Sequence, residues 1–339
     1  MTHAPTPLTF SALRLLSARE FLSGEQLARS LGVSRTSVWR ALRDLEAVGV
    51  TLLRLQGRGY RLTASIDWLD PAQVRRYLGV HADAYELRVV DMLESTNTTL
   101  LEEAVAGAAG GLMLAAELQI RGRGRRGRAW YAALGGALTF SVLWRFEQGA
   151  GFLAGLGLAV GVALVRALRS LGLEGAMLKW PNDLLIRHHK LAGTLVEIQG
   201  DVLGPSLAVI GVGINFRLDA LTRERVDQAV TDLVTAGVPY DRNRVLGEVL
   251  VHLARVLNAF RVHGFGPLRN EWGSYHVYAE RAVTVRLPDG AREEGTVAGV
   301  GDDGALLLQT RAGLRRFHSG EVSLRAAGDE RRWRRASSL

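Results

Sequence analysis

Residues 8–62 show three short helical patterns followed by a pair of short strands, and no other feature constrains the fold of this chain as strongly. The second helical pattern opens at Ser23, which begins a Ser-Gly-Glu-Gln capping box, and ends at Gly32. Ser34 is placed to cap the third pattern, whose apolar residues recur at intervals of four and three. Helix, helix, glycine turn, helix and hairpin in this order predict a winged helix-turn-helix domain over residues 1–66.

The outer surface of this predicted domain is basic. Residues 1–65 contain nine arginines and four acidic residues, which gives a net charge of +5. Because DNA phosphates attract such a surface, we expect the domain to bind DNA through its third helix and the tip of its hairpin. The alternative is a three-helix interaction module that does not touch DNA. The expected DNA contacts are Ser34, Arg35, Thr36, Ser37, Arg40, Arg43 and Arg58.

Residues 67–272 mix helical windows with β-branched runs that are typical of strands. Helices are expected from Asp70-Pro71 onward, over 98–109 and over 155–171, and strands over 85–92, 112–118, 137–144, 191–198 and 207–214. Since the strands do not alternate regularly with helices, the pattern favours an α+β fold with a mixed sheet over a doubly wound parallel sheet.

After Trp272 the pattern changes to short alternating strands separated by Pro-Asp-Gly and Asp-Asp-Gly turns. We expect a small β-barrel over residues 273–326, followed by a basic tail over residues 327–339. The sequence therefore predicts three folded domains, over residues 1–66, 67–272 and 273–326.

Several classes of protein are excluded by composition. The 339 residues include no cysteine, which excludes disulfides, thiolate metal sites and acyl transfer through a thioester. The longest uncharged stretch, residues 148–165, carries five glycines and runs into Arg166, so it favours a buried helix over a membrane span. The first nine residues lack a basic segment followed by an apolar run, so we expect no secretory signal and a cytoplasmic location.

Lysine is almost absent from the chain. Of the 42 lysines and arginines, only Lys179 and Lys190 are lysines, and they lie close together in the sequence. A bias toward arginine does not explain this proximity, and an ammonium group is not interchangeable with a guanidinium group. Both lysines are therefore candidate site residues.

Residues 122–128 alternate three glycines with four arginines directly after a predicted strand. Glycine lets the backbone approach a ligand closely, and guanidinium groups hydrogen-bond to anions. The segment is not a P-loop, because no GxxxxGK[ST] sequence occurs in the chain. Composition alone leaves three interpretations: a phosphate site, a solvated loop, or an Arg-Gly tract that binds nucleic acid.

Three further motifs follow. Residues 179–183 (Lys-Trp-Pro-Asn-Asp) place a lysine, a carboxamide and a carboxylate at a strand end, residues 190–193 (Lys-Leu-Ala-Gly) lead into an apolar run, and residues 211–215 (Gly-Val-Gly-Ile-Asn) end another strand. Each motif also has a purely structural explanation: a capped turn for the first, a single surface-reaching lysine for the second, and a strand weakened by glycines for the third.

Together with residues 94–97 (Glu-Ser-Thr-Asn), these motifs occur in an order that resembles the biotin–protein ligases, and the likeness extends from about Leu8 to Arg325. With its N-terminal domain, the chain is similar to the bifunctional BirA family, whose members also repress the biotin operon. The resemblance implies a central class II synthetase-like mixed sheet with helices and a C-terminal SH3-like β-barrel.

The resemblance also implies the reaction of a biotin–[acetyl-CoA-carboxylase] ligase. With ATP and Mg²⁺, the biotin carboxylate attacks the α-phosphate, giving biotinoyl-5′-AMP and pyrophosphate, and a lysine of a biotin carboxyl carrier protein domain then takes the biotinoyl group. Two unit charges 4 Å apart interact by about 4 kcal/mol at an effective dielectric constant near 20, so two anionic reactants require a cationic site. No protein nucleophile is needed, which agrees with the absence of cysteine.

By the same resemblance, each motif acquires a role. The catalytic cations would be Lys190, Arg125 and Arg123. The biotin-binding residues would be Ser95, Thr96, Asn97, Gln119, Gly122, Arg123, Gly124, Arg125 and Lys190. The ATP-binding residues would be Arg128, Trp130, Lys179, Asn182, Asp183, Asn215 and Arg325. Mg²⁺ would be bound by Asp183 and Asn215, and residues 122–128 would form a mobile lid that keeps water from the acyl phosphate.

The chain departs from the family pattern in two places. Ile120 and Arg121 stand where small or polar residues are expected beside the lid, and residues 217–239 contain no aromatic residue to stack on adenine. Three alternatives remain beside a ligase that is also a repressor: a ligase with a non-regulatory winged helix, a lipoate–protein ligase, and a basic nucleic-acid-binding protein. The expected partners are the carrier protein domain of acetyl-CoA carboxylase, operator DNA, and a second copy of the chain in a ligand-induced homodimer.

Overall fold

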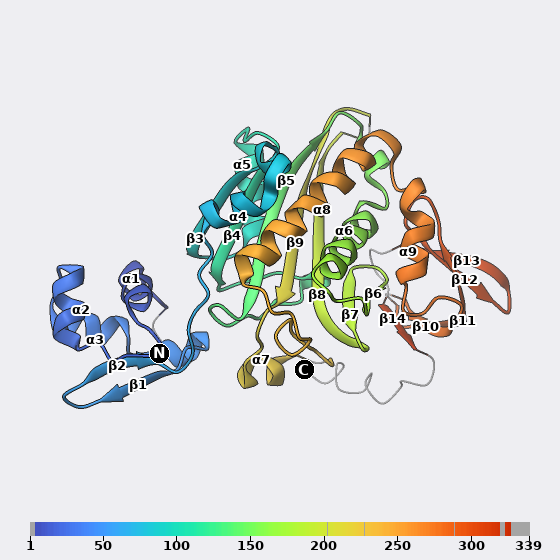
Figure 1. Cartoon of the computed structure of the whole chain (residues 1–339). Coiled ribbons are helices and arrows are strands. Elements are labelled where there is room, and N and C mark those ends of the chain that lie inside the picture. Colours follow the sequence, from blue (N-terminus) through green and yellow to red (C-terminus); the bar gives the residue numbers. More distant parts are fainter. Residues whose placement is uncertain (1–3, 202, 227, 288, 319–322, 327–339) are drawn as a thin grey trace.

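The computed structural model describes residues 4–318 and 323–326, apart from residues 202, 227 and 288 (Figure 1). The predicted basic tail lies outside these residues. In this view the N-terminal domain and the C-terminal strands lie on opposite sides of the central sheet (Figure 1). No helix within the described ranges is long and apolar enough to cross a membrane. Part of the uncharged stretch instead belongs to the buried helix α6 (Leu156–Ser170), as predicted.

The N-terminal elements follow the predicted order. They are α1 (Pro7–Leu15), α2 (Gly24–Leu31), α3 (Arg35–Ala41), the 3-10 turn η1 (Leu45–Val48), β1 (Leu52–Leu55) and β2 (Gly59–Leu62). Ser23 forms the predicted capping box, and Gly32 ends α2 in a left-handed conformation with φ of 64°. α3 is shorter than its apolar spacing predicts, because Leu45 lies in η1. The winged helix-turn-helix is confirmed.

The central domain is built on a seven-stranded sheet with the order β3-β4-β5-β9-β8-β7-β6. Its strands are β3 (Glu86–Leu93), β4 (Leu112–Gln119), β5 (Ala137–Phe146), β6 (Ala176–Lys179), β7 (Asp183–Ile186), β8 (His189–Gly200) and β9 (Ser206–Asn215). β3 and β4 are parallel and the other neighbouring pairs are antiparallel, so the predicted mixed sheet is confirmed. The strand end expected at residues 179–183 is that of β6, which ends at Lys179, whereas β7 is not expected from the sequence.

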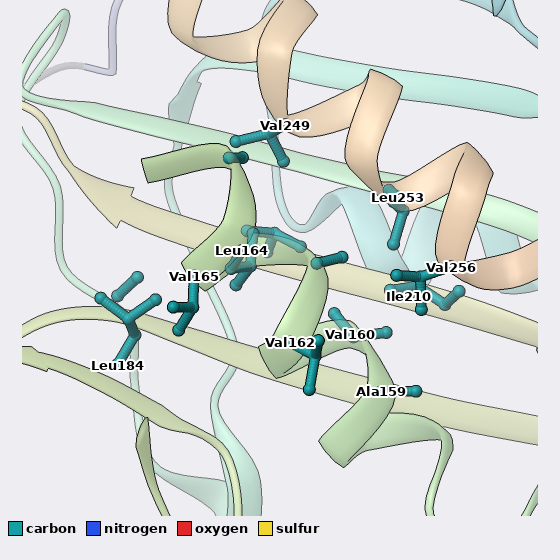
Figure 2. Packing of buried hydrophobic residues seen from close by; sticks show 14 of the residues in the cluster. Ala159, Val160, Val162, Leu164, Val165, Leu184, Ile210, Val249, Leu253 and Val256 are labelled. Carbon is teal, nitrogen blue, oxygen red and sulfur yellow. The ribbon is translucent and has the colours of Figure 1, made fainter. Parts of the chain in front are cut away.

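Helices cover both faces of this sheet. α6 and α8 (Arg242–His263) pack together on one face, where Figure 2 shows Leu164 of α6 with Val249 and Leu253 of α8. α5 (Thr96–Val105) covers the other face, since alternate strand residues point to opposite sides and Leu114 packs with Leu100 of α5. The remaining helices and turns are α4 (Pro71–Leu78), η2 (Gly79–Ala84), η3 (Arg125–Gly127), η4 (Ala150–Leu153), α7 (Ala220–Arg225), η5 (Gly266–Leu268) and α9 (Arg269–Tyr275).

The C-terminal strands form a separate antiparallel sheet with the order β13-β12-β11-β10-β14. They are β10 (Ala282–Arg286), β11 (Arg292–Val300), β12 (Leu306–Thr310), β13 (Gly313–Phe317) and β14 (Ser323–Ala326). The small all-β unit is therefore present as predicted. The domain boundary predicted after Trp272 lies inside α9, which leads from the central domain toward this sheet.

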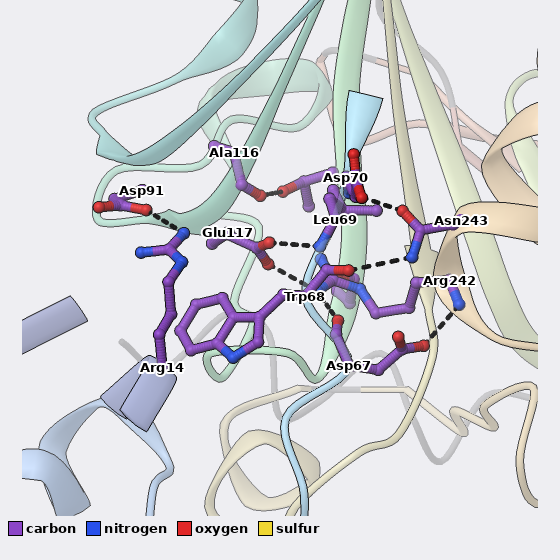
Figure 3. A network of polar contacts seen from close by, with 12 residues as sticks. Arg14, Asp67, Trp68, Leu69, Asp70, Asp91, Ala116, Glu117, Arg242 and Asn243 are labelled. Carbon is purple, nitrogen blue, oxygen red and sulfur yellow. Dashed lines mark hydrogen bonds and ion pairs between the residues drawn. The ribbon is translucent and has the colours of Figure 1, made fainter. Parts of the chain in front are cut away.

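A buried polar network holds the linker between the N-terminal and central domains (Figure 3). Arg242 Nη1 and Glu117 Oε2 are 2.6 Å apart, and both side chains are fully buried. Arg242 also donates to the backbone oxygen of Asp67 at 2.8 Å, while Glu117 accepts from the Leu69 amide at 2.6 Å. Because breaking the ion pair would leave a buried charge without its partner, these bonds fix the linker against β4 and α8.

The N-terminal domain also packs directly on the central domain. Leu118 and Leu134 of the central domain belong to the hydrophobic core of the N-terminal domain. The Leu134 amide donates to Val48 O at 2.9 Å, and Arg14 and Asp91 form an ion pair at 2.5 Å. The stretch that follows the Arg-Gly segment therefore contacts η1, the turn that follows α3.

Candidate functional site

The N-terminus of α5 and the end of β4 bring four predicted residues together. Ser95 caps α5, and Thr96 and Asn97 are buried. Gln119 Oε1 accepts from the Thr96 amide at 2.7 Å. Ser141 Oγ on β5 lies 2.6 Å from Asn97 Oδ1. The result is a polar wall with fixed donors and acceptors, which suits recognition of a small polar ring.

Glycines on β8 and β9 let neighbouring side chains lie flat on the sheet. A Cβ on the second glycine of the 211–215 motif would come 2.5 Å from the Trp130 ring, and one on the first would overlap Asn97. A Cβ on the glycine of the 190–193 motif would lie 3.2 Å from Lys190 Nζ. Asn97 and Trp130 therefore require glycine at the two positions on β9, while a side chain at the position on β8 would press on the flexible end of Lys190. We call the three glycines the glycine floor: Gly193, Gly211 and Gly213.

The Arg-Gly segment folds into a loop whose two ends are joined by backbone hydrogen bonds. Gly122 O accepts from the Trp130 amide at 2.8 Å, and the Gly124 amide donates to Arg128 O at 2.7 Å. At the tip, Arg126 has a φ of 59°, which reverses the chain. Trp130 at the base of the loop therefore rests on the glycine floor while Arg128 is exposed.

Two cations from different segments meet beside this loop. Lys190 Nζ lies 2.6 Å from Asp183 Oδ1 and 5.8 Å from the centre of the Trp130 ring. Arg125 Nη1 donates to Asn182 Oδ1 at 3.3 Å. Burial lowers the pKa of the Arg125 guanidinium, and the charge of Asp183 opposes this shift. The structure thus places Arg125 and Lys190 around the same carboxylate.

Two buried donors at this place have no acceptor among the residues that the structure describes. They are Arg125 Nη2 and Trp130 Nε1. A buried polar group without a partner costs about 1–3 kcal/mol. A ligand carrying carboxylate or phosphate oxygens would supply the acceptors, so the site is prepared for an anion.

Arg123 makes different contacts from Arg125. Its Nη1 donates to Thr98 Oγ1 at 3.0 Å, and its Nη2 forms an ion pair with Glu197 on β8. Glu197 belongs to none of the predicted site motifs. Its signal is the two-residue alternation of β8, which puts Glu197 on the same face as Gly193.

Lys179 is buried at the end of β6 beside an aromatic cluster. The His276 ring stacks on Trp272 with ring centres 4.7 Å apart, and the Val277 amide donates to Leu178 O at 2.8 Å. Burial and the charge of Lys179 lower the pKa of His276 to about 4, so this histidine is neutral near pH 7. No local motif points to His276, because its neighbours come from the tertiary fold.

The residues predicted for Mg²⁺ provide few oxygens. Asp183 pairs with Lys190, and Asn215 Nδ2 donates to the backbone oxygens of Lys190 and Thr231 at 3.3 and 3.0 Å. Within the described ranges, no three His, Asp or Glu side chains gather around a metal position. Mg²⁺ at nucleotide sites is commonly held by one or two carboxylates plus phosphates and waters, so Asp183 fits a metal carried by ATP. Arg325 lies in β14, and its side chain is outside the described part of the structure.

The predicted DNA contacts lie on α3 and the hairpin. The exposed members are Ser34, Arg35, Thr36, Arg40, Arg43 and Arg58. Ser37 is half-buried and shares a hydrogen bond with Ser34 at 2.9 Å. Trp39, which the sequence analysis does not include, is 48% exposed on α3, and the Arg43 guanidinium lies 5.5 Å from its ring. An exposed aromatic ring beside basic residues extends this surface.

Known proteins match the chain over all three domains. Family profiles match an HTH domain over residues 9–61, the Biotin/lipoate A/B protein ligase family over residues 89–215 and the Biotin protein ligase C terminal domain over residues 279–325. The solved biotin protein ligase from Aquifex aeolicus in complex with biotin and ATP is 28% identical, with a TM-score of 0.60, over 72% of this chain and 100% of that chain. The fold and the site thus define a protein ligase of the biotin/lipoate class with an added DNA-binding type of domain.

Two curated relatives are similar over nearly the whole length. The bifunctional ligase/repressor BirA of Salmonella typhimurium is 34% identical over 96% of this chain and 100% of that protein. The protein of the same name from Escherichia coli is 35% identical over 93% of this chain and 96% of its own length. The chain belongs to the BirA family of bifunctional ligase/repressors.

Proposed function

We propose that this protein is an ATP-dependent biotin–protein ligase that also acts as a biotin-responsive repressor of biotin synthesis genes. The observation that carries the ligase activity is the meeting of Lys190 and Arg125 beside Trp130, with two buried donors that lack an acceptor among the described residues. The polar wall suits a small polar ring, Trp130 on the glycine floor offers that ring an aromatic surface, and the cations suit its carboxylate.

In the first half-reaction, an oxygen of the biotin carboxylate attacks the α-phosphorus of ATP. The bond between the α-phosphorus and the oxygen that bridges the α- and β-phosphates breaks, and pyrophosphate leaves with the electron pair. Lys190 and Arg125 offset the repulsion between the two anions, while Asp183 holds Lys190 Nζ in place. Because both reacting atoms belong to substrates, the protein contributes position and charge. Bound Mg²⁺ would neutralise the nucleotide phosphates, with Asp183 as its proposed protein ligand.

In the second half-reaction, the neutral amine of an acceptor lysine attacks the biotinoyl carbonyl carbon. AMP leaves with the electron pair of the acyl–oxygen bond, and the amine proton passes to solvent. The Arg-Gly loop excludes water from the acyl phosphate until this lysine arrives.

Transfer of labelled biotin tests the ligase activity. The protein is mixed with biotin, Mg·ATP and a biotin carboxyl carrier domain, and the expected result is label on one carrier lysine together with biotin-dependent ATP–pyrophosphate exchange. Lipoate in place of biotin is the control for a lipoate ligase. No transfer of biotin, or equal transfer of lipoate, would contradict the proposal.

The repressor activity rests on the exposed basic face of α3 and the hairpin. We propose that ligand binding induces a homodimer that spans two operator half-sites, that the acceptor is the carrier domain of acetyl-CoA carboxylase, and that the protein works in the cytoplasm. A gel shift with and without biotin and ATP should show ligand-dependent binding to a palindromic operator. Binding that ignores the ligand, or no binding, would favour a ligase with a non-regulatory winged helix.

A further inference from the structure

We propose that Glu197 is a positioning residue that fastens the Arg-Gly loop to α5 and β8 through Arg123, which leaves Arg125 as the arginine that faces the ligand. The inference rests on the proposed ligase function for its kinetic consequences. Its structural core, the order of the loop, is testable without any ligand.

Both carboxylate oxygens of Glu197 are engaged. Oε1 accepts from Arg123 Nη2, and Oε2 accepts from Asn97 Nδ2 at 2.8 Å. Arg123 Nη1 in turn donates to Thr98 Oγ1 at 3.0 Å. A strand, the first turn of a helix and the loop therefore meet at one carboxylate. Hydrogen bonds between charged groups are roughly twice as strong as neutral ones, so this junction is suited to hold the loop.

Arg123 and Arg125 differ in the side-chain donors that they leave without an acceptor. Arg123 places both of its Nη atoms on protein acceptors. Arg125 places Nη1 on Asn182, while its buried Nη2 has no acceptor among the described residues. A group that binds a ligand needs a donor to offer, whereas a group that anchors a loop needs its donors satisfied. The contacts thus divide the two tasks between the two residues.

The anchoring carboxylate is also connected to the polar wall of the site. Asn97, which donates to Glu197, lies 2.6 Å from Ser141 Oγ, and Ser141 Oγ lies 2.6 Å from Thr96 Oγ1. Thr96 is bonded to Gln119. Loss of the Glu197 charge should therefore loosen the loop first and the start of α5 second.

The chain supplies a matched control directly before the loop. Arg121 and Glu94 form an ion pair at 3.1 Å with side chains 75% and 59% exposed, compared with 43% and 24% for Arg123 and Glu197. Exposed pairs contribute little to stability. Glu94→Gln therefore removes the same charge near the same loop without removing the anchor.

The first experiment measures loop order by limited trypsin cleavage of the unliganded, full-length protein, since the loop is rich in arginine. We expect Glu197→Gln to be cut within residues 121–128 about fivefold faster than wild type, because one charge-assisted contact is lost at a partly exposed site. Glu94→Gln should stay within about twofold of wild type, and Glu197→Asp should restore part of the protection. Equal cleavage of Glu197→Gln and wild type, or equal acceleration by Glu94→Gln, would overturn the proposal. Thermal unfolding midpoints close to that of wild type show that the variants are folded.

The second experiment measures release of preformed biotinoyl-AMP and ATP–pyrophosphate exchange. Glu197→Gln should release the adenylate about fivefold faster while the kcat of exchange changes by less than about twofold. Slower release would mean that Glu197 competes with the ligand for Arg123, and loss of exchange in a folded variant would place Glu197 in the chemistry; either result overturns the anchoring role. If wild type itself shows no biotin-dependent exchange, the proposed function fails, and the trypsin comparison alone decides the inference.

Discussion

The cations of α3 and those of the ligand site differ in their exposure to water, and this difference separates two ways of handling a polyanion. Arg40 on α3 and Arg43 just after that helix are exposed, whereas Arg125 is half-buried and Lys190 is ion-paired beneath the loop. Exposed charges attract DNA over about 10 Å at 0.1 M salt and are screened by added salt. Partly buried charges act at contact distance and are screened less, so burial allows one chain to treat DNA and ATP differently.

The largest effect should come from removing the half-buried ammonium group of Lys190. Lys190→Ala removes one of the two cations beside Asp183, the one proposed to offset carboxylate–phosphate repulsion. We expect biotin-dependent ATP–pyrophosphate exchange to fall by about 10³-fold or more, while salt-dependent binding to random DNA is unchanged. Near-normal exchange in this variant would contradict the assigned role of Lys190.

Burial should also decide how much an ion pair contributes to folding. Glu117→Leu leaves Arg242 buried without its partner, and we expect the free energy of unfolding to fall by about 3–5 kcal/mol. The control is Glu25→Leu, which breaks an exposed pair with Arg29 at 3.1 Å and should cost less than about 1 kcal/mol. Urea unfolding measures both. Equal losses would show that burial does not set the strength of these pairs.

Removal of the Arg125 guanidinium group should separate formation of the adenylate from its retention. Arg125→Gly keeps the loop backbone but deletes the buried donor, so we expect detectable formation of biotinoyl-AMP with release faster by about 100-fold. The measurement is dissociation of labelled adenylate from the preformed complex. Unchanged retention would remove the lid role from Arg125.

The free energy of unfolding should depend on pH through one buried histidine, His276. The folded-state pKa of His276 is about 4, below the ordinary value of 6.5, so the unfolded chain binds more protons between these values. The stability is fully present above pH 6.5 and decreases as the pH falls toward 4. Between pH 7 and pH 5 we expect a loss of about 2 kcal/mol from this group. His276→Phe keeps an aromatic ring against Trp272 and should lack that part of the loss in urea unfolding at the two pH values.

The smallest effect is expected on the exposed face. Arg40→Ala should weaken operator binding by several-fold and reduce the salt slope of binding by about one, without changing adenylate formation. Titration of a labelled operator at several salt concentrations measures the slope. An unchanged slope would mean that Arg40 does not neutralise a phosphate.

The N-terminal domain could be predicted from sequence because its signals are local. The capping box at Ser23, the left-handed Gly32 and the cap at Ser34 each act within one turn of helix. The order of the site motifs likewise indicated which segments meet, and the structure places Lys190 beside Asp183 and Arg125 beside Asn182. The roles assigned to these residues stay predictions.

Other features depend on contacts that no local pattern records. α8 is buried on much of its surface between α6 and the sheet, so it lacks the narrow apolar stripe that marks a surface helix. The strand end at Lys179 is expected, but β6 and β7 have four residues each, which is too short for an alternation that would give their bounds. Glu197 and His276 acquire their partners from distant segments, and the environment of each is defined only after folding.

Leu118 and Leu134 affect what loss of the N-terminal domain would do to the rest of the protein. Both side chains complete a core that belongs mainly to residues 10–62. Deleting those residues would expose an apolar patch on the remaining enzyme, next to the segment that follows the Arg-Gly loop. A shortened, single-purpose version would therefore need polar replacements at these two leucines to remain soluble.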